Sequence, residues 1–148
     1  MTLRKRTPCV GICSTTYGDL VCRGCKRFAH EIVQWNSYAP QQQERVWQRL
    51  GELRDAVVLH HLQISDEVLF SEACTSYDIE PSSKSAAIYH LLGVLVKQPT
   101  ALTSVGLQLN PQVQPAAATA ALDVLQAIDA EIYTRSVAHY ERNFKIPL

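Results

Sequence analysis

The sequence predicts an all-α fold, in which a cysteine-rich N-terminal segment packs on a bundle of about five helices. Apolar residues recur at helical spacing in several segments, and residues that commonly begin or end helices bound those segments. Four of the five cysteines lie between positions 9 and 25. Hydrophobic residues make up 47% and charged residues 19% of the 148 residues, which is typical of one globular domain with at most a small appendage.

The N-terminal part is expected to be a module of its own. It covers residues 1–38 and is followed by a helical body at 39–148. Within the module, residues 1–8 are expected to form a basic, irregular arm, and residues 9–25 a cysteine loop. Positions 20 and 21 of this loop should form a short extended piece that leads into the second pair of cysteines.

A first helix is predicted over residues 24–37, because Phe28, Ile32 and Trp35 fall at i, i+4 and i+7 and therefore share one face. We expect this face to dock the N-terminal module on the helical body, since large aromatic residues usually belong to cores. The alternative is that Phe28 and Trp35, together with Tyr17, form a platform on which nucleic-acid bases stack.

Four further helices are predicted in the body from apolar stripes and capping residues. Ser65 and Ser82 are expected to cap the second and third of them. The third is apolar on most sides and is expected at the centre of the core. A single helical turn closed by Gly106 is expected in the weakly patterned stretch 98–115. The four predicted helices cover residues 40–62, 66–76, 83–97 and 116–143. The buried face of the last one is expected to contain Leu122, Leu125, Ile128 and Ile132.

The clustered cysteines follow the pattern Cys9-x3-Cys13-x8-Cys22-x2-Cys25, which suits four thiolate ligands around one metal centre. The preferred interpretation is a structural zinc site, because a short pair at a helix start and a second close pair can supply a tetrahedron. An iron–sulfur cluster also takes four thiolates, although the spacing matches neither common ferredoxin pattern. A third interpretation is redox chemistry at Cys22 and Cys25, where a helix N-terminus and basic neighbours would lower a thiol pKa. The fifth cysteine, Cys74, is expected to be a small buried residue.

Positive charge is concentrated near the cysteines. Residues 1–30 contain six basic residues against one acid, a net charge of +5 in a chain whose formal charge is zero. This suggests contact with an anionic partner such as RNA, a ribonucleoprotein or an acidic protein surface. The alternative is that the cations keep the module soluble and offset the negative charge of metal-bound thiolates. The candidate contact residues are Arg4, Lys5, Arg6, Arg23, Lys26 and Arg27.

Two roles are open to Arg23 and Arg27, which flank the second cysteine pair. They can clamp a phosphate near the start of the first predicted helix, where backbone N–H groups attract anions. They can instead hydrogen-bond the cysteine sulfurs or, in the case of Arg27, pair with Glu31 four residues later. The structural role is favoured, because such pairs are common on helices.

Residues around the cysteines resemble the motif of a known family. The motif residues are Pro8, Cys9, Gly11, Cys13, Cys22, Arg23, Gly24, Cys25, Arg27, Glu31, Ile32 and Trp35. They are similar to those of a small bacterial cysteine-rich family, domain of unknown function 1289, which is often described as a predicted iron–sulfur protein. The match covers about residues 7–55. The resemblance implies a metal-binding N-terminal module on a short cytoplasmic protein, with no established reaction.

The sequence therefore predicts a non-enzymatic adaptor or regulatory protein, whose basic four-cysteine module contacts an anionic partner. An enzyme is less favoured, because four thiolates leave a zinc ion no open position for substrate or water. The alternative is an iron–sulfur protein with a redox or accessory role. A third hypothesis is that the helical body binds a small ligand between its helices.

The expected location is the cytoplasm, where thiols stay reduced. The first residues carry basic side chains without the apolar run of a secretory signal. The longest apolar stretch is well short of the roughly 20 residues that span a bilayer, so no membrane contact is expected.

Overall fold

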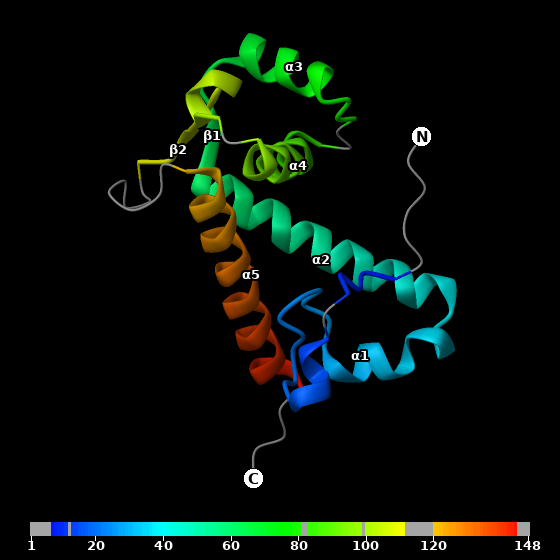
Figure 1. Ribbon diagram of the computed structural model, residues 1–148. Coiled ribbons are helices and arrows are strands. Elements are labelled where there is room, and N and C mark those ends of the chain that lie inside the picture. The colour runs from blue at the N-terminus through cyan, green and yellow to red at the C-terminus, as the bar shows by residue number, and fades with distance from the viewer. Residues whose placement is uncertain (1–6, 12, 81–82, 99, 112–119, 145–148) are drawn as a thin grey trace. The chain divides into compact units, whose positions relative to one another are not determined.

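The computed structural model describes residues 7–11, 13–80, 83–98, 100–111 and 120–144. The chain forms two compact units, of which the first comprises residues 1–53 and 132–148 and the second residues 54–131. The boundaries fall inside two long helices, α2 (Pro40–His61) and α5 (Ala121–Asn143), which are labelled in Figure 1. Each of these helices therefore contributes residues to both units.

The first unit begins with the cysteine loop. A short 3-10 helix, η1 (Ser14–Tyr17), precedes an isolated antiparallel bridge between Val21 and Phe28. The expected extended piece before Cys22 is thus present. Helix α1 (Ala29–Gln34) and the 3-10 turn η2 (Trp35–Ser37) follow and lead into α2.

The first helix begins later than the apolar spacing predicts. Residues 22–27 form a tight hairpin instead, in which the Lys26 N–H donates to the Cys22 carbonyl at 2.9 Å and the Cys22 N–H donates to the Arg27 carbonyl at 3.0 Å. The second bond occupies the Arg27 carbonyl, which a helix would pair with the Glu31 N–H, and the positive φ of Lys26 interrupts the helical backbone, so α1 starts only after Phe28. The prediction of a helix from residue 24 is wrong for this reason.

Phe28 is the centre of the first unit's core, with 1% of its surface exposed. Its ring contacts three aromatic residues at the C-terminal end of the described chain, with centroids 5.7 Å from His139, 5.4 Å from Tyr140 and 5.2 Å from Phe144. Figure 1 shows these last turns of α5, in red, beside the N-terminal segment, in blue. The core of this unit is therefore built by both ends of the described chain.

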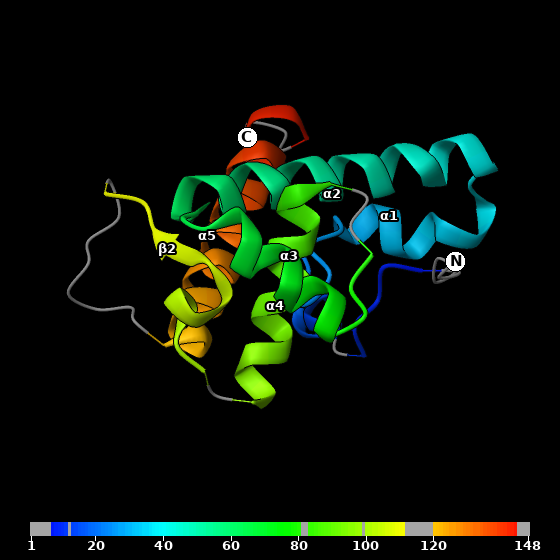
Figure 2. The ribbon, with the colours of Figure 1, turned by 90° about the horizontal axis from the view of Figure 1, so that it is seen from above.

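The second unit contains α3 (Glu67–Ser76), α4 (Lys84–Lys97), the 3-10 turn η3 (Leu102–Val105) and two short strands. Strands β1 (Leu62–Ile64) and β2 (Leu107–Leu109) pair antiparallel, with Leu62 opposite Leu109. Helix α3 lies beside both α4 and η3 (Figure 2). The fold is mainly helical, as predicted, but not purely α. The sequence did not reveal the strands because each has only three residues.

Helix α4 lies in the core of the second unit, which confirms the prediction that this helix is central. Three of its side chains, Ala87, Leu91 and Leu92, are completely buried. The buried face of α5 is partly different from the prediction: Ile128 and Ile132 are buried, but Leu122 is 47% exposed and Val124 takes the inner position.

The helix caps are shifted by one residue from the prediction. The cap of α3 is Asp66 rather than Ser65, and its carboxylate accepts from the N–H groups of Val68 and Leu69. The cap of α4 is Ser83, whose hydroxyl accepts from the Ala86 N–H at 3.2 Å, whereas the predicted cap at position 82 lies outside the described residues. Both caps satisfy amide groups that lack a partner within the helix.

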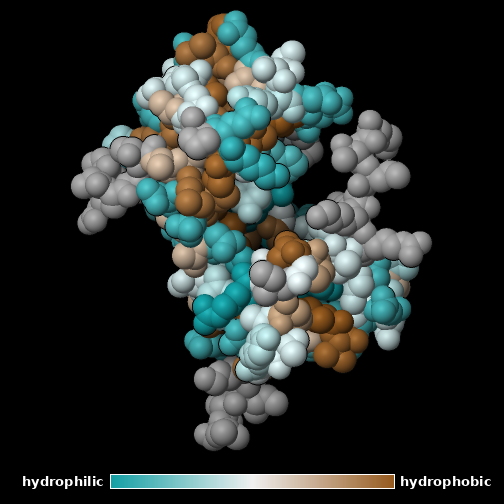
Figure 3. Space-filling view, viewed as in Figure 1, coloured by the Kyte–Doolittle hydropathy of each residue, from teal (hydrophilic) through white to brown (hydrophobic). Residues whose placement is uncertain are grey.

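None of the helices in the described part of the chain has the length and apolar character that a membrane-spanning segment requires. Figure 3 shows hydrophobic residues interspersed with hydrophilic ones on the face in view. Several large apolar side chains are exposed, among them Val33 and Val68.

Gly106 fixes the approach of η3 to α3. Its φ of 76° lies in the left-handed region, as expected for the residue that closes this turn. Its carbonyl accepts from the Ser65 N–H at 2.7 Å. A Cβ atom here would overlap the Asp66 carbonyl oxygen and lie 2.9 Å from the Phe70 nitrogen. The start of α3 therefore requires glycine at this position.

Gly106→Ala should lower the free energy of unfolding by about 2–4 kcal/mol, because left-handed backbone strain and overpacking add. Gly93→Ala is the matched control. Gly93 lies inside α4, and no described neighbour comes within 4 Å of the place that a methyl group would occupy. Alanine there should therefore raise stability by up to about 1 kcal/mol. Urea unfolding of both variants measures the difference. Equal stability of Gly106→Ala and the parent protein would contradict the close approach.

Candidate functional site

All five cysteines lie among the described residues and carry free thiols. Cys22 and Cys25 are buried in the hairpin of residues 22–27, whereas Cys9 and Cys13 are half-buried. Cys74 is buried in the second unit, as the sequence predicts for a small apolar residue.

The hairpin holds an unusual backbone conformation at Lys26, whose φ is 68°. This region is uncommon for residues other than glycine. The hydrogen bonds of the Lys26 side chain offset the cost of this backbone conformation. Its ammonium donates to the carbonyl oxygens of Arg23 at 2.6 Å and Gly24 at 2.8 Å. The lysine thereby ties together the loop that carries the second cysteine pair.

N–H groups donate hydrogen bonds to three of the four clustered sulfurs. The Cys22 sulfur accepts from the backbone N–H groups of Cys25, Ser14 and Gly24. Arg27 Nε donates to Cys25 Sγ at 3.3 Å, and the Gly11 N–H donates to Cys9 Sγ at 3.3 Å. Donors in these positions favour a thiolate over a thiol.

The two sulfurs of the second pair have opposite pKa shifts. Burial raises the pKa of Cys22, but the three N–H donors and the Cys25 thiol together lower it by more, so that it falls from the ordinary 9.0 to about 7. Burial raises the pKa of Cys25, and this effect outweighs the hydrogen bonds from Arg27 that lower it. Without a metal, Cys22 therefore ionises at a lower pH than Cys25.

Ser14 connects the first cysteine pair to the second. It follows Cys13 directly, and its hydroxyl accepts from the Arg23 N–H at 2.8 Å. Its own N–H donates to the Cys22 sulfur. Next to it, Cys13 Sγ and Thr15 Oγ1 are 2.7 Å apart and share a hydrogen. The backbone beside Cys13 therefore touches the sulfur of Cys22.

The described residues do not form a closed metal site. Nowhere among them do three or more His, Cys, Asp or Glu side chains lie close enough together to hold a metal ion. The chemistry of the cysteine side chains nevertheless fits a metal that binds thiolates. N–H groups donate to the sulfurs of Cys9, Cys22 and Cys25, and Cys22 ionises near neutral pH. The four-cysteine metal site remains a prediction.

The basic residues around the cysteines divide into two groups. Lys26 and Arg27 are 5% and 4% exposed, and the side chains of both donate hydrogen bonds within the cysteine loop. Arg27 also places its guanidinium 5.0 Å from the centre of the Trp35 ring. Arg23 has a side chain that is 67% exposed, and it forms an ion pair with Asp19 at 3.3 Å. Arg4, Lys5 and Arg6 lie outside the described residues.

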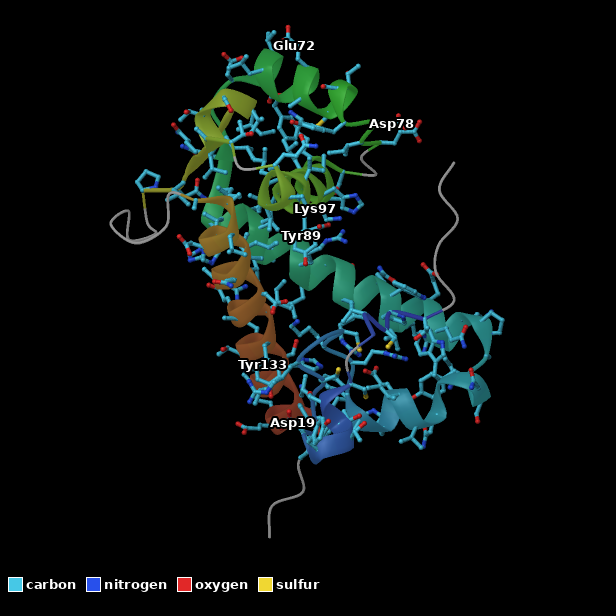
Figure 4. The ribbon with its side chains drawn as sticks, in the orientation of Figure 1. Asp19, Glu72, Asp78, Tyr89, Lys97 and Tyr133 are labelled. Carbon is cyan, nitrogen blue, oxygen red and sulfur yellow. The ribbon has the colours of Figure 1, made fainter. Side chains whose placement is uncertain are left out.

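Figure 4 shows Asp19 and Tyr133 near each other in the first unit. The guanidinium of Arg23 joins them, because it binds Asp19 and lies 4.7 Å from the centre of the Tyr133 ring. Arg23 is therefore the exposed cation of the described cysteine loop.

The aromatic residues are placed as core rather than as a platform. Phe28 and Trp35 are buried and Ile32 is partly buried, so neither aromatic ring presents a free face for stacking. Trp35 packs edge-on against Trp47, with the ring centroids 6.5 Å apart. Tyr17 differs, since 89% of its surface is exposed.

The sequence did not reveal the ion pair that anchors α1. Glu31, which is 5% exposed, pairs with Arg49 of α2 through two hydrogen bonds of 2.5 and 2.7 Å. The structure thus gives Glu31 this partner in place of the expected Arg27. The same carboxylate accepts from the Phe28 N–H at 2.8 Å. No local spacing rule connects Glu31 with Arg49, because they are 18 positions apart.

Comparison with known proteins confirms the resemblance given by the cysteine motif. A family model described as "Protein of unknown function (DUF1289)" matches residues 7–54. No curated protein and no solved structure matches the chain. The matched segment contains the four clustered cysteines and ends within one residue of the first stretch of the first unit. The part of α5 that completes this unit lies outside the match.

In metal-free, reduced protein, the thiolate absorbance of Cys22 should appear near pH 7, about two pH units below an ordinary cysteine. Because its folded pKa lies below its unfolded pKa, this thiolate stabilises the fold fully above about pH 9, and that contribution is lost as the pH falls through about 7. Ultraviolet titration of the chelator-treated protein measures the step.

Two variants test whether Cys22 is the source of this absorbance step. The step should be absent from Cys22→Ser and present in Cys74→Ser, since burial raises the pKa of Cys74. A parent protein without a thiolate step below about pH 8 would contradict the effect of the N–H donors.

Proposed function

We propose that the chain is a non-enzymatic metal-binding adaptor, in which Cys9, Cys13, Cys22 and Cys25 hold one metal centre. The ordered module then presents its exposed cationic residues to an anionic partner. The observation that carries the metal proposal is the set of N–H donors around the sulfurs, above all the three that converge on Cys22. Donors of this kind orient metal-binding thiolates and adjust their charge.

Charge balance supports the same proposal. Four thiolates around a divalent ion carry a net charge of −2, and two buried cations, Lys26 and Arg27, lie in the loop that carries the second pair. A buried cation is stable only when an opposite charge or several acceptors balance it. A thiolate centre provides such a charge, which gives these two residues a role inside the module.

Zinc is the preferred occupant. A four-thiolate zinc site is closed and supplies folding energy without redox chemistry, which suits a module that is too small to build a large core. The second candidate is an iron–sulfur cluster, because N–H donors to cysteine sulfurs also set the potential of such clusters. Either centre needs reduced thiols, and we place the protein in the cytoplasm for this reason.

The partner that the described surface suits best is single-stranded RNA. Arg23 offers an exposed guanidinium, and its ion pair with Asp19 is a surface pair that a phosphate can replace at little cost. Tyr17 offers an exposed ring in the same loop, on which a base can stack. Arg4, Lys5 and Arg6 would add charge from the N-terminal arm.

Native protein purified without oxygen should contain one metal equivalent, and Cys22→Ser should lose it. Cys74→Ser is the matched control and should keep the metal, because Cys74 belongs to the second unit. Elemental analysis for zinc and iron makes the measurement. A colourless zinc protein supports the preferred centre, whereas visible absorbance with stoichiometric iron supports the cluster. Equal metal content in the parent protein and Cys22→Ser would contradict the proposal.

The metal-loaded protein should bind single-stranded RNA at low salt, and Arg23→Gln should weaken the binding and reduce the salt dependence by about one phosphate contact. Arg54→Gln removes the same charge from the second unit and should have little effect. Fluorescence anisotropy over a salt series measures both. Absence of binding at low salt, or an equal loss in the two variants, would contradict the RNA proposal.

A further inference from the structure

A cavity of about 560 Å³ lies in the second unit, along strand β1. Three consecutive residues of this strand, Leu62, Gln63 and Ile64, line the cavity. Successive side chains of a strand point to opposite faces, so a cavity that touches all three lies beside the edge of the strand. One edge of β1 is paired with β2. The cavity therefore follows the edge that no strand in the described part of the chain covers.

The hydrogen bonds between the strands show which main-chain groups of β1 point toward this cavity. Before the strand, the Asn110 N–H donates to the His61 carbonyl at 2.9 Å. After it, the Ser65 N–H donates to the Gly106 carbonyl at 2.7 Å. Bonded and non-bonded pairs alternate along an antiparallel ladder, so the N–H and carbonyl of Ile64 point away from β2. Neither group bonds a residue that the structure describes, and both can pair with a further strand.

The side chains around the cavity suit an apolar ligand. Leu62 of β1 and Ile88 of α4 line it and are each 1% exposed. Leu59 also lines it, although this side chain is largely exposed. An apolar side chain that packs on these residues would remove apolar surface from water. The Gln63 side chain makes no hydrogen bond with any described residue, so its amide can bind a peptide group.

The charge of the cavity differs from the charge of the unit around it. The charged lining residues, Lys84 and Glu67, form an ion pair of 2.9 Å, so the lining has no net charge. The second unit as a whole contains nine acidic and three basic residues. Its electrostatic field therefore attracts cationic partners, while the cavity favours neutral groups. A segment with an apolar centre and basic residues on either side complements both.

We propose that the free edge of β1 binds such a segment of a partner protein, which adds a third, extended strand to the sheet. One residue of the segment exchanges two hydrogen bonds with the main chain of Ile64. A neighbouring apolar side chain enters the cavity and packs on Leu62 and Ile88. Strand addition of this kind takes its affinity from main-chain hydrogen bonds and its specificity from pockets for alternate side chains.

This contact is independent of the proposed metal centre and of the proposed RNA contact. All of its residues belong to the second unit and lie beyond the segment that the family model matches. It gives an adaptor a second binding surface, which takes a protein where the first takes RNA.

The peptide Lys-Val-Ile-Val-Lys, with a fluorophore at its N-terminus and an amide at its C-terminus, tests the proposal. Fluorescence anisotropy with the full-length native protein at low salt should show saturable binding. A peptide with N-methyl groups on its three apolar residues keeps every side chain but cannot donate to the Ile64 carbonyl. It should bind about tenfold more weakly. A peptide with Glu in place of both Lys residues should also bind more weakly, because the second unit is acidic.

Two proline variants distinguish the edges of the sheet. Ile64→Pro removes the N–H that points away from β2 and leaves the ladder bonds in place, since an edge strand tolerates proline at such a position. This variant should bind the peptide about tenfold more weakly. Leu109→Pro is the matched control. Leu109 opposes Leu62 in a non-bonded pair, so its N–H points outward from the other edge, and the variant should bind like the parent protein.

Circular dichroism and thermal unfolding verify that both variants fold, and the N-methyl comparison decides the question on the parent protein if one does not. Lack of saturable binding, equal affinity for the parent and N-methylated peptides, or equal losses in Ile64→Pro and Leu109→Pro would overturn the proposal. A second copy of the chain on the same edge would overturn it as well. Sedimentation velocity would then show a dimer that Ile64→Pro dissociates, and the peptide would not bind.

Discussion

The partly buried ion pair between Glu31 and Arg49 organises the first unit. One carboxylate accepts two hydrogen bonds from Arg49 and a third from the Phe28 N–H, so it fixes the start of α1 and joins α1 to α2. Because Phe28 also closes the hairpin through its bridge to Val21, the cysteine loop depends on the same carboxylate. Loss of Arg49 would leave the buried Glu31 carboxylate without its cation, which is costly because a buried charge needs a partner.

The distribution of charge in the sequence is not the distribution on the surface. Two of the basic residues near the cysteines are buried. Lys26 donates hydrogen bonds to two carbonyl oxygens of the loop, and Arg27 donates one to the Cys25 sulfur. This arrangement agrees with the alternative in which cations offset thiolate charge. It leaves Arg23 as the exposed cation of the described loop.

Long amphipathic or apolar segments were predictable and short or non-local features were not. The apolar patterns predicted α2 and α4 nearly to the residue, because burial of a stripe decides such helices. The start of α1 was wrong, because hairpin hydrogen bonds and a left-handed lysine override the spacing of Phe28, Ile32 and Trp35. At the candidate site, the spacing of the cysteines could be recognised from the sequence. The pairing of Glu31 with Arg49 required the fold.

The residues that bury the Phe28 ring include three near the C-terminal end of α5. His139, Tyr140 and Phe144 contact its ring, although they lie beyond the segment matched by the family. During synthesis the cysteine loop therefore emerges from the ribosome long before its own core can close. Such late closure raises the contact order of the unit and is expected to slow its folding.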